Sequence, residues 1–245
     1  MRLQVFLSHS GACSRRKALL LVKQGEVTVN GRVIQEPSYD VDANQDVQLG
    51  AKKIELKKNT YLVLNKPRGV VTTSSDKYAS RTVKDLLPPG YRHLYPVGRL
   101  DKDSEGLLLF TNDGELAFKL MHPRFKVDKV YFVEVRGRLR REDITRLEKG
   151  VFIEGRRTHP AKISPVYSKS HISGFSITIH EGRKRQIRLM LLSLGYKVNC
   201  LRRIQYGPIQ LAGLKPGRWR MLPDEQVSAL RRATIGGSTT LTIGG

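Results

Sequence analysis

The sequence predicts an α+β protein built from a small N-terminal unit and a larger second unit. Three observations lead to this prediction. The length of 245 residues suits a medium domain beside a small one, expected strands come in runs with helices between some of them, and a lysine-rich segment interrupts the pattern early. We therefore divide the chain into a first unit at residues 1–50, a linker at 51–59, a second unit at 60–232 and a flexible tail at 233–245.

The first unit is expected to form helices followed by a small sheet. Ser14 is a favourable N-cap residue and Gly25 is a natural helix stop, so the segment between them predicts a helix. Asn30-Gly31 lies within an alternating segment and is the strongest short signal for a β-hairpin. The expected elements in chain order are a helical turn at 5–7, a helix at 15–24, hairpin strands within 26–34 and a strand at 46–49.

The second unit mixes strands and helices. Short apolar runs bounded by turn residues predict buried strands, and segments that end at glycine or before proline predict helices. Ile187, Met190, Leu191 and Leu194 recur at helical spacing and mark one apolar face. The expected strands are residues 61–65, 107–110, 131–135, 151–153, 161–167 and 175–180. The expected helices are residues 80–87, 114–121, 140–149 and 183–194.

The charge balance is the strongest compositional signal. The chain has 44 Lys and Arg against 22 Asp and Glu, which gives a formal net charge of +22 and an isoelectric point of about 10.3. A surplus of this size favours contact with a polyanion, and nucleic acid is the leading candidate. A membrane surface is disfavoured, because no basic amphipathic segment carries exposed Trp or Phe.

Other compositional features bear on compartment and cofactors. No apolar run reaches membrane-spanning length and no signal peptide is visible, so we expect a cytoplasmic protein. Cys13 and Cys200 are far apart and lack the spacing of metal ligands, which indicates reduced structural thiols. The sequence contains no glycine-rich phosphate-binding fingerprint and no zinc ligand set, so we expect neither a cofactor nor a metal.

Two clusters of basic residues are candidates for RNA contact. The first lies on or beside the expected helix of the first unit. The second opens the expected helix at 183–194, where free backbone N–H groups and the helix dipole favour anions. Either cluster also fits an ordinary solvated surface. The candidate RNA-binding residues are Arg15, Arg16, Lys17 and Lys23 in the first cluster and Arg183, Lys184 and Arg185 in the second.

A charged loop at residues 98–106 precedes an apolar strand and holds the candidate reactive group, Asp101. A reactive carboxylate in a pocket has to stay ionised. Because burial raises its pKa, a close arginine is needed, and Arg99 and Arg188 are the candidates. On the residues alone, an aspartate that bonds its own loop backbone is the favoured alternative. Tyr131, near the start of an expected strand, is either a stacking platform for a base or a core residue.

A specific motif runs through the first unit. Leu7-x-x-x-Gly11-x-x-Ser14-Arg15-Arg16-x-Ala18 is followed by Gly25-x-Val27-x-Val29-Asn30-Gly31. With these residues the first unit resembles an S4 RNA-binding domain over residues 2–49. The resemblance implies RNA binding through the helical face.

Further motifs extend over almost the whole chain. In order they are Asn65-Lys66-Pro67-x-Gly69, Tyr95-Pro96-Val97-Gly98-Arg99-Leu100-Asp101-x-x-Ser104-x-Gly106-Leu107-Leu108, Thr111-Asn112-Asp113-Gly114, Lys129-x-Tyr131, Glu181-Gly182-Arg183-x-Arg185-Gln186-Ile187-Arg188, Lys215-Pro216-Gly217 and Trp219-Arg220. With these motifs in this order and spacing, residues 1–232 resemble a pseudouridine synthase of the Rsu type. The resemblance implies a mixed, largely antiparallel sheet with flanking helices and a central cleft.

The same resemblance implies roles for single residues. Asp101 would be the catalytic aspartate, acting as nucleophile or base, and Tyr131 would stack on the target uracil. Arg188 would pair with Asp101 and hold it ionised, and Arg99 would help to flip or hold the nucleotide. Leu189 stands where many relatives carry another arginine, a departure that bears on the choice of RNA target.

The expected activity is therefore the isomerisation of a specific uridine in ribosomal RNA to pseudouridine, in which the N1–C1′ bond is cleaved and the sugar is rejoined to C5. The expected partner is ribosomal RNA, free or in a pre-ribosomal particle, and we expect a monomer. The alternative is a non-catalytic RNA-binding or ribosome-assembly factor, which the basic composition and the S4-like unit fit equally. A hydrolase that pairs Asp101 with Asp103 is disfavoured, because the two side chains would point to opposite sides of a strand-like loop.

Overall fold

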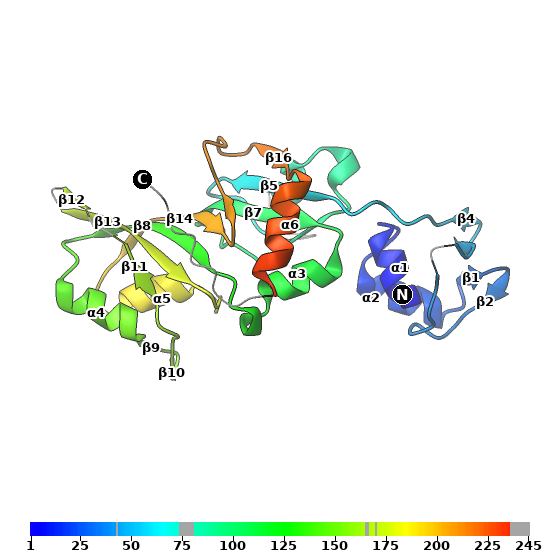
Figure 1. Cartoon of the computed structure of the whole chain (residues 1–245), viewed down its shortest axis with the longest axis horizontal. Helices are drawn as coiled ribbons and strands as arrows, with labels where there is room; N and C mark the ends of the chain where they lie inside the picture. The colour runs from blue at the N-terminus through cyan, green and yellow to red at the C-terminus, as the bar shows by residue number, and fades with distance from the viewer. Residues whose placement is uncertain (43, 74–80, 165–166, 170, 236–245) are drawn as a thin grey trace. The chain divides into compact units, whose positions relative to one another are not determined.

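The computed structural model describes residues 1–42, 44–73, 81–164, 167–169 and 171–235. These residues divide into two compact units (Figure 1). The first comprises Met1–Thr60 with Asn112–Gly114, and the second comprises the described parts of Tyr61–Thr111 and Glu115–Gly245. Both units contain helices and strands, which confirms the predicted α+β class.

The first unit packs two helices on a four-stranded antiparallel sheet. Its elements are α1 (Leu3–His9), α2 (Arg15–Lys23), β1 (Val27–Val29), β2 (Arg32–Val33), β3 (Val47–Leu49) and β4 (Lys52–Lys53), with the strands in the order β2-β1-β3-β4. The helices and the sheet share one apolar core of Leu3, Phe6, Leu7, Ala18, Val22, Val27, Val29, Val41, Val47 and Ile54.

Local sequence signals of the first unit are confirmed. The Ser14 hydroxyl accepts a hydrogen bond from the backbone N–H of Lys17 at 3.3 Å, as an N-cap residue does. Gly25 follows α2 with a φ of +76°, the left-handed conformation that ends many helices. Asn30 and Gly31 both have positive φ, which the tight turn between β1 and β2 requires.

One strand of the first unit was not predicted. Lys52–Lys53 forms β4 beside β3, and Ile54 is buried in the core of this unit. The expected linker at 51–59 is therefore wrong for these three residues. Two exposed lysines on a sheet edge protect that edge from further pairing, and their charge concealed the strand pattern.

The second unit is built on a long, mainly antiparallel sheet. The main path runs β11-β13-β8-β14-β7-β5-β16, with β12 paired to β13, β15 to β14 and β6 to β7. Among the described strands only the β14–β7 pair is parallel, which confirms the largely antiparallel sheet. A separate hairpin is formed by β9 (Phe152–Ile153) and β10 (Arg156–Arg157). The other strands are β5 (Tyr61–Lys66), β6 (Tyr95–Pro96), β7 (Glu105–Thr111), β8 (Lys129–Arg136), β11 (Lys162–Ile163), β12 (Tyr167–Lys169), β13 (Ile172–Ile179), β14 (Val198–Tyr206), β15 (Ile209–Gln210) and β16 (Trp219–Met221).

Helices cover both faces of this sheet. They are α3 (Gly114–Met121), α4 (Arg141–Lys149), α5 (Gln186–Leu192) and α6 (Asp224–Ala233), with short 3-10 turns η1 (Val83–Leu86), η2 (Pro89–Tyr91) and η3 (Pro123–Phe125). None of the helices in the described residues is long and apolar enough to cross a membrane.

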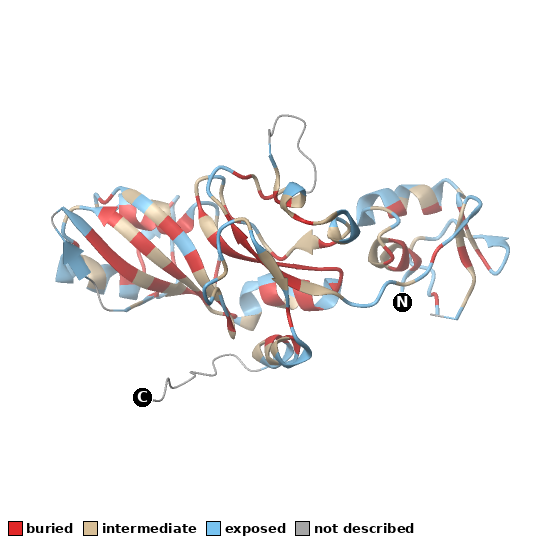
Figure 2. Cartoon of the chain, turned by 90° about the horizontal axis from the view of Figure 1, so that it is seen from above, coloured by how far each residue is buried: buried red, intermediate tan, exposed pale blue. Residues whose placement is uncertain are grey.

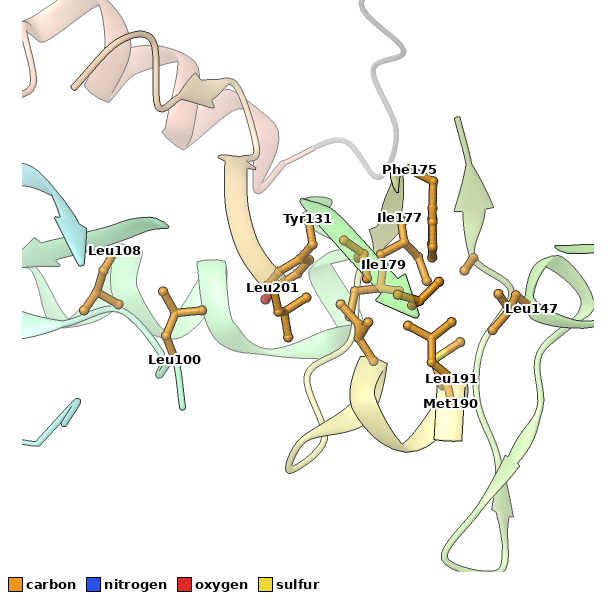
Figure 3. Close-up of a cluster of buried hydrophobic side chains, with 14 of the residues drawn as sticks. Leu100, Leu108, Tyr131, Leu147, Phe175, Ile177, Ile179, Met190, Leu191 and Leu201 are labelled. Carbon is orange, nitrogen blue, oxygen red and sulfur yellow. The ribbon is translucent and has the colours of Figure 1, made fainter. Parts of the chain in front are cut away.

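The alternation of side chains along the strands creates two cores. Leu62 and Leu64 of β5 belong to one core, while Val63 belongs to the other, as expected for successive residues of a strand. Figure 2 shows buried and partly buried residues alternating along β8, and Figure 3 shows Met190 and Leu191 of α5 facing the strand residues of the larger core. The smaller core lies under α3 and α6. The sheet is therefore fixed from both sides, which gives β7, β8 and β14 a rigid setting.

Several predicted elements of the second unit differ from the structure. The expected helix at 80–87 is a single 3-10 turn, η1, and Ser80 lies outside the described residues. The expected strand at 161–167 is divided between β11 and β12, with residues 165–166 outside the described part. Most of the expected tail, residues 236–245, is also outside it. The strands β14, β15 and β16 and the helix α6 were not predicted.

The helix expected at 183–194 begins three residues later, at Gln186. Arg185 directly before it has φ 50° and ψ 27°, a left-handed conformation that an α-helix cannot include. Arg183, Lys184 and Arg185 therefore lie in the loop before α5 rather than in its first turn.

Gly106 permits the parallel contact between β7 and β14. Its φ is +104°, and a Cβ atom at this position would lie 2.3 Å from the backbone oxygen of Arg203 and 2.7 Å from its nitrogen. We predict that Gly106→Ala lowers the free energy of unfolding by about 3 kcal/mol, because it adds backbone strain to a clash that only strand separation relieves. Denaturant unfolding monitored by circular dichroism measures this loss.

Gly90→Ala is the matched control for this substitution. Gly90 has no atom within 4 Å of its would-be Cβ and no positive φ. Its replacement should change the free energy of unfolding by less than about 0.5 kcal/mol. Equal effects of the two substitutions would contradict a special role for Gly106.

Candidate active site

A cleft of about 1650 Å³ opens in the second unit. It is lined by the loop that precedes β7, by residues of β8 and β14, and by the loop that leads into α5. Residues from distant parts of the sequence thus meet in one place. The cleft includes the predicted site residues Arg99, Asp101, Tyr131, Arg183, Lys184 and Arg185.

The Asp101 loop has a defined backbone. The Ser104 N–H donates to the Asp101 carbonyl oxygen at 3.1 Å, which closes a tight turn between these residues. The fully buried Lys66 ammonium donates to the carbonyl oxygens of Asp101 at 3.0 Å and Ser104 at 2.6 Å. The Thr72 hydroxyl donates to the Leu100 carbonyl oxygen at 2.8 Å. The main chain that carries Asp101 is therefore held by buried donors, while the Asp101 carboxylate itself is about one-third exposed.

The ion pairs at this loop differ from the predicted one. Arg188 Nη2 lies 3.3 Å from Asp103 Oδ2 and donates to the Asp103 carbonyl oxygen at 3.0 Å. The cation beside Asp101 is Arg185, whose Nη1 lies 3.9 Å from Asp101 Oδ2. Arg188 and Asp101 thus form no ion pair in the described residues. The reason is the tight turn, which presents Asp103 to α5, together with the left-handed backbone of Arg185. Burial lowers the pKa of Arg188, and the charges of Asp103 and Asp101 act against this shift.

The side chain of Asp103 lies on the same side of the loop as that of Asp101, which differs from the prediction. Because residues 101–104 form a turn rather than a strand, Asp103 and Asp101 both face the Arg185 guanidinium, which contacts their carboxylates at 3.2 and 3.9 Å. The expectation that the two side chains point apart is therefore wrong. Partial burial acts to raise the pKa of Asp103, but the hydrogen bonds from Arg185 and the charge of Arg188 outweigh it, and the pKa lies below its usual value.

Tyr131 forms part of the cleft wall beside a buried arginine that sequence reasoning missed. Arg203 lies opposite Tyr131 across the β8–β14 pair and is only 2% exposed. Its Nη1 donates to the Tyr131 hydroxyl at 3.4 Å, and its Nε donates to the Leu107 carbonyl oxygen of β7 at 2.7 Å. Arg203 therefore ties Tyr131 to the strand that follows the Asp101 loop. Figure 3 shows Tyr131 of β8 next to Leu201 of β14, the strand that also carries Arg203.

Comparison with known proteins now adds to this geometry. A family model described as RNA pseudouridylate synthase matches residues 60–193, and a model of the S4 domain matches residues 1–47. Ribosomal large subunit pseudouridine synthase B of Bacillus subtilis is 40% identical over 232 residues, which cover 94% of this chain and 95% of that protein. The chain belongs to the RNA pseudouridylate synthase family.

Two further relatives support the same assignment. An uncharacterized RNA pseudouridine synthase of Aquifex aeolicus is 37% identical over 235 residues, which cover 95% of this chain and 94% of that protein. A crystal structure of a pseudouridylate synthase matches with a TM-score of 0.68 and 26% identity, covering 94% of this chain and 99% of that chain. The pseudouridine synthase fold and the N-terminal S4 domain predicted from the sequence are therefore confirmed.

The remaining basic candidates of this pseudouridine synthase are placed as follows. Arg99 and Lys184 are exposed at the cleft, while Arg183 donates to the carbonyl oxygens of Arg156 and Arg157 at 3.2 and 2.7 Å and so anchors the β9–β10 hairpin. The S4 domain exposes its predicted basic residues along α2, whose opposite face buries Ala18 and Val22. Those exposed residues are Arg15, Arg16, Lys17 and Lys23.

Proposed function

We propose that this synthase converts a specific uridine of ribosomal RNA to pseudouridine, with Asp101 as its catalytic group. The observation that carries the proposal is the cleft itself, which is lined by Asp101 and Arg185 from two loops and by Tyr131 from the sheet. Ribosomal RNA is proposed as the substrate because the Bacillus subtilis relative is named for the ribosomal large subunit.

The proposed chemistry needs no co-substrate. The N1–C1′ bond breaks, the uracil turns and a C5–C1′ bond forms; the proton lost from C5 is balanced by the proton gained at N1, so the atoms of the product are those of the substrate. Asp101 acts on the uridine directly, as nucleophile or base, and the Arg185 guanidinium lies 3.9 Å from its carboxylate. The Asp101 carboxylate lines a basic cleft and is therefore placed to act on a uridine that enters it.

The target uridine has to leave its base stack to reach Asp101. Flipping a nucleotide costs about a few kcal/mol. We propose that Tyr131 replaces part of the lost stacking, which is worth roughly 1–3 kcal/mol per base, and that Arg99 holds the flipped nucleotide. Arg183, Lys184 and Arg185 would add positive charge beside the RNA backbone.

Purified protein and unmodified ribosomal RNA provide the decisive test. Transcripts of large and small subunit RNA, and pre-ribosomal particles from cells that lack the gene, are incubated with the enzyme, and pseudouridine is mapped at nucleotide resolution. We expect conversion at a specific site. Tight RNA binding with no pseudouridine at any position would instead support a non-catalytic assembly factor.

We further propose that the enzyme acts as a monomer in the cytoplasm, where it meets its RNA. Light scattering of the purified chain measures the mass, for which one chain corresponds to 27.7 kDa. A stable dimer under assay conditions would contradict the monomer.

The S4 domain is proposed to bind RNA phosphates through α2. We predict that replacing both Arg15 and Arg16 with glutamine weakens RNA binding, and that the slope of log affinity against log salt falls by about 0.7 to 0.9 for each phosphate that the protein no longer neutralises. Fluorescence anisotropy titrations at several salt concentrations measure both changes. Because the substitutions lie in the S4 domain, the maximal rate with bound RNA should not change.

Replacement of Lys52 and Lys53 with glutamine is the matched control, because it removes the same charge from an exposed edge of the same domain. If both pairs of substitutions weaken binding equally, the S4 domain contributes only its net charge and α2 has no special role.

A further inference from the structure

We propose that Asp103 is a positioning residue that holds the guanidinium groups of Arg185 and Arg188 beside the catalytic carboxylate. This inference rests on the proposed role of Asp101. It assigns different roles to the two carboxylates of the loop: Asp101 acts on the uridine, and Asp103 fixes the cations around it.

The contacts of Asp103 are those of a clamp. Arg185 reaches it with two parallel bonds, Nη1 to Oδ1 at 3.2 Å and Nη2 to Oδ2 at 3.3 Å. Arg188 adds Nη2 to Oδ2 at 3.3 Å and a hydrogen bond to the Asp103 carbonyl oxygen at 3.0 Å. Paired bonds between a planar guanidinium and a carboxylate fix orientation as well as distance. Asp103 therefore fixes the Arg185 guanidinium, and together with the Val198 carbonyl oxygen, which accepts from Arg188 Nη1 at 3.4 Å, it fixes the Arg188 guanidinium.

Asp101 is held much less tightly. Among the described residues its carboxylate has one ion pair, the 3.9 Å approach of Arg185. That distance is longer than either bond from Arg185 to Asp103. The cation beside Asp101 is thus placed by Asp103 and not by Asp101 itself. Such an arrangement leaves the Asp101 carboxylate weakly engaged, as a group that has to approach a uridine needs to be.

Arg185 needs an external anchor to remain in place. Its side chain is 44% exposed, and its backbone adopts a left-handed conformation that is unfavourable for residues other than glycine. Strained conformations of this kind persist only where surrounding contacts fix them. The paired bonds to Asp103 are the strongest such contacts that Arg185 makes in the described residues.

The charges of the cluster support the same division of roles. Two carboxylates close together disfavour each other's ionised form, unless cations are placed between or beside them. Arg185 and Arg188 supply two positive charges for the two negative charges of Asp101 and Asp103. Removal of the Asp103 charge would break the paired bonds that hold the Arg185 guanidinium beside Asp101, while Arg188 would keep only its bonds to the carbonyl oxygens of Asp103 and Val198.

Single-turnover kinetics with Asp103→Asn test the proposal. We expect the maximal rate constant to fall by about 10- to 100-fold, while the dissociation constant for the RNA changes by less than about 3-fold, since removal of a negative charge does not weaken attraction to phosphates. Glu115→Gln is the control, because it removes an exposed carboxylate paired with Lys119 on α3 and should leave both constants unchanged. A wild-type rate in Asp103→Asn would overturn the proposal.

A double-substitution cycle tests whether Asp103 acts through Arg185. If it does, Arg185→Met should lower the single-turnover rate constant by a much smaller factor in the Asp103→Asn background than in the wild type, because the paired bonds between Arg185 and Asp103 are already broken. If the two substitutions lower the rate constant by independent, multiplying factors, Asp103 does not act through Arg185. The Asp101→Asn variant separates the two ideas: if it keeps its activity, the proposed function fails, whereas a normal rate in Asp103→Asn alone overturns only the positioning role.

A measurement without RNA completes the test. The guanidinium Nη–H resonance of Arg185, whose Nη1 and Nη2 donate to Asp103, should be protected from solvent exchange in the wild type and in Asp101→Asn, and should broaden in Asp103→Asn. Persistence of that resonance in Asp103→Asn would overturn the clamp whatever the activity of the enzyme.

Discussion

Replacing Asp101 with asparagine is expected to abolish pseudouridine formation and to leave folding and RNA binding intact. Asparagine has the same shape as aspartate, but its neutral amide is neither a useful nucleophile nor a base. We expect the single-turnover rate constant to fall by about 10⁴-fold or more, the upper range of effects for a group that acts directly on the substrate.

The surroundings of Asp101 explain why this substitution should act on chemistry alone. The loop is fixed through backbone carbonyl oxygens, which Lys66 and the turn to Ser104 hold, and not through the Asp101 side chain. Arg185 keeps its paired bonds to Asp103 when the Asp101 charge is removed. Unfolding curves and RNA titrations should therefore match those of the wild type.

Glu142→Gln provides the control for this experiment, because Glu142 is an exposed carboxylate in the first turn of α4, away from the Asp101 loop in sequence. It should react at the wild-type rate. Conversion of uridine by Asp101→Asn at more than a few per cent of the wild-type rate would show that another group performs the reaction.

Features set by neighbours in the sequence were predictable. The cap at Ser14, the stop at Gly25 and the hairpin turn at Asn30-Gly31 depend on one to four adjacent residues, and all were confirmed. The strands β5, β7 and β8 were also predicted, since each carries an apolar run between turn signals.

The strand β14 was not predicted, because its pairing depends on contacts that are distant in the sequence. Its sequence places Arg202 and the fully buried Arg203 in the middle of a sheet, so the apolar pattern of a strand is broken. Arg203 is tolerated there because Leu107 and Tyr131, from two other strands, accept its hydrogen bonds. Those acceptors are 96 and 72 residues away along the chain, and no local pattern reveals them.

The choice of ion-pair partners was unpredictable for a related reason. Arg188 reaches Asp103 rather than Asp101 because of the tight turn at 101–104 and the late start of α5. Both are backbone details of one or two residues. The resemblance predicted that Arg188 pairs with Asp101, but Arg185, which was assigned to RNA contact, is the arginine that lies beside Asp101.

Replacing Lys66 with methionine is expected to affect both stability and activity. The Lys66 side chain is fully buried, and its ammonium donates to the carbonyl oxygens of Pro67, Asp101 and Ser104 at 3.2, 3.0 and 2.6 Å. Methionine fills a similar volume but removes one hydrogen bond from each of these acceptors, of which the Asp101 carbonyl oxygen keeps the Ser104 N–H. At about 1 kcal/mol for each acceptor, the free energy of unfolding should fall by about 3 kcal/mol.

The same substitution should slow catalysis, because the three carbonyl oxygens belong to the loop that carries Asp101 and to the turn that follows β5. We expect the single-turnover rate constant to fall by about 100-fold. Lys119→Met is the control, because it removes a lysine of α3 whose one ion pair in the described residues is with Glu115. Apart from the small loss of this ion pair, it should change neither the free energy of unfolding nor the rate constant. A stable and fully active Lys66→Met variant would contradict this role of Lys66.

The pH dependence of the wild type offers an independent check. Burial, the largest influence, lowers the pKa of Lys66 to about 8, although the charges of Asp101, Asp103 and Glu105 oppose the shift. Above pH 8 the folded protein releases this proton, while the unfolded chain keeps it up to about pH 10.5, so the contribution of Lys66 to the free energy of unfolding rises with pH in this interval.

A neutral Lys66 amine has only two N–H donors for three carbonyl oxygens. The rate constant should therefore decline as the pH passes 8, while the contribution of Lys66 to stability does not. If the rate constant and the free energy of unfolding both decline above pH 8, the loss of activity comes from unfolding of the domain and not from a loosened Asp101 loop.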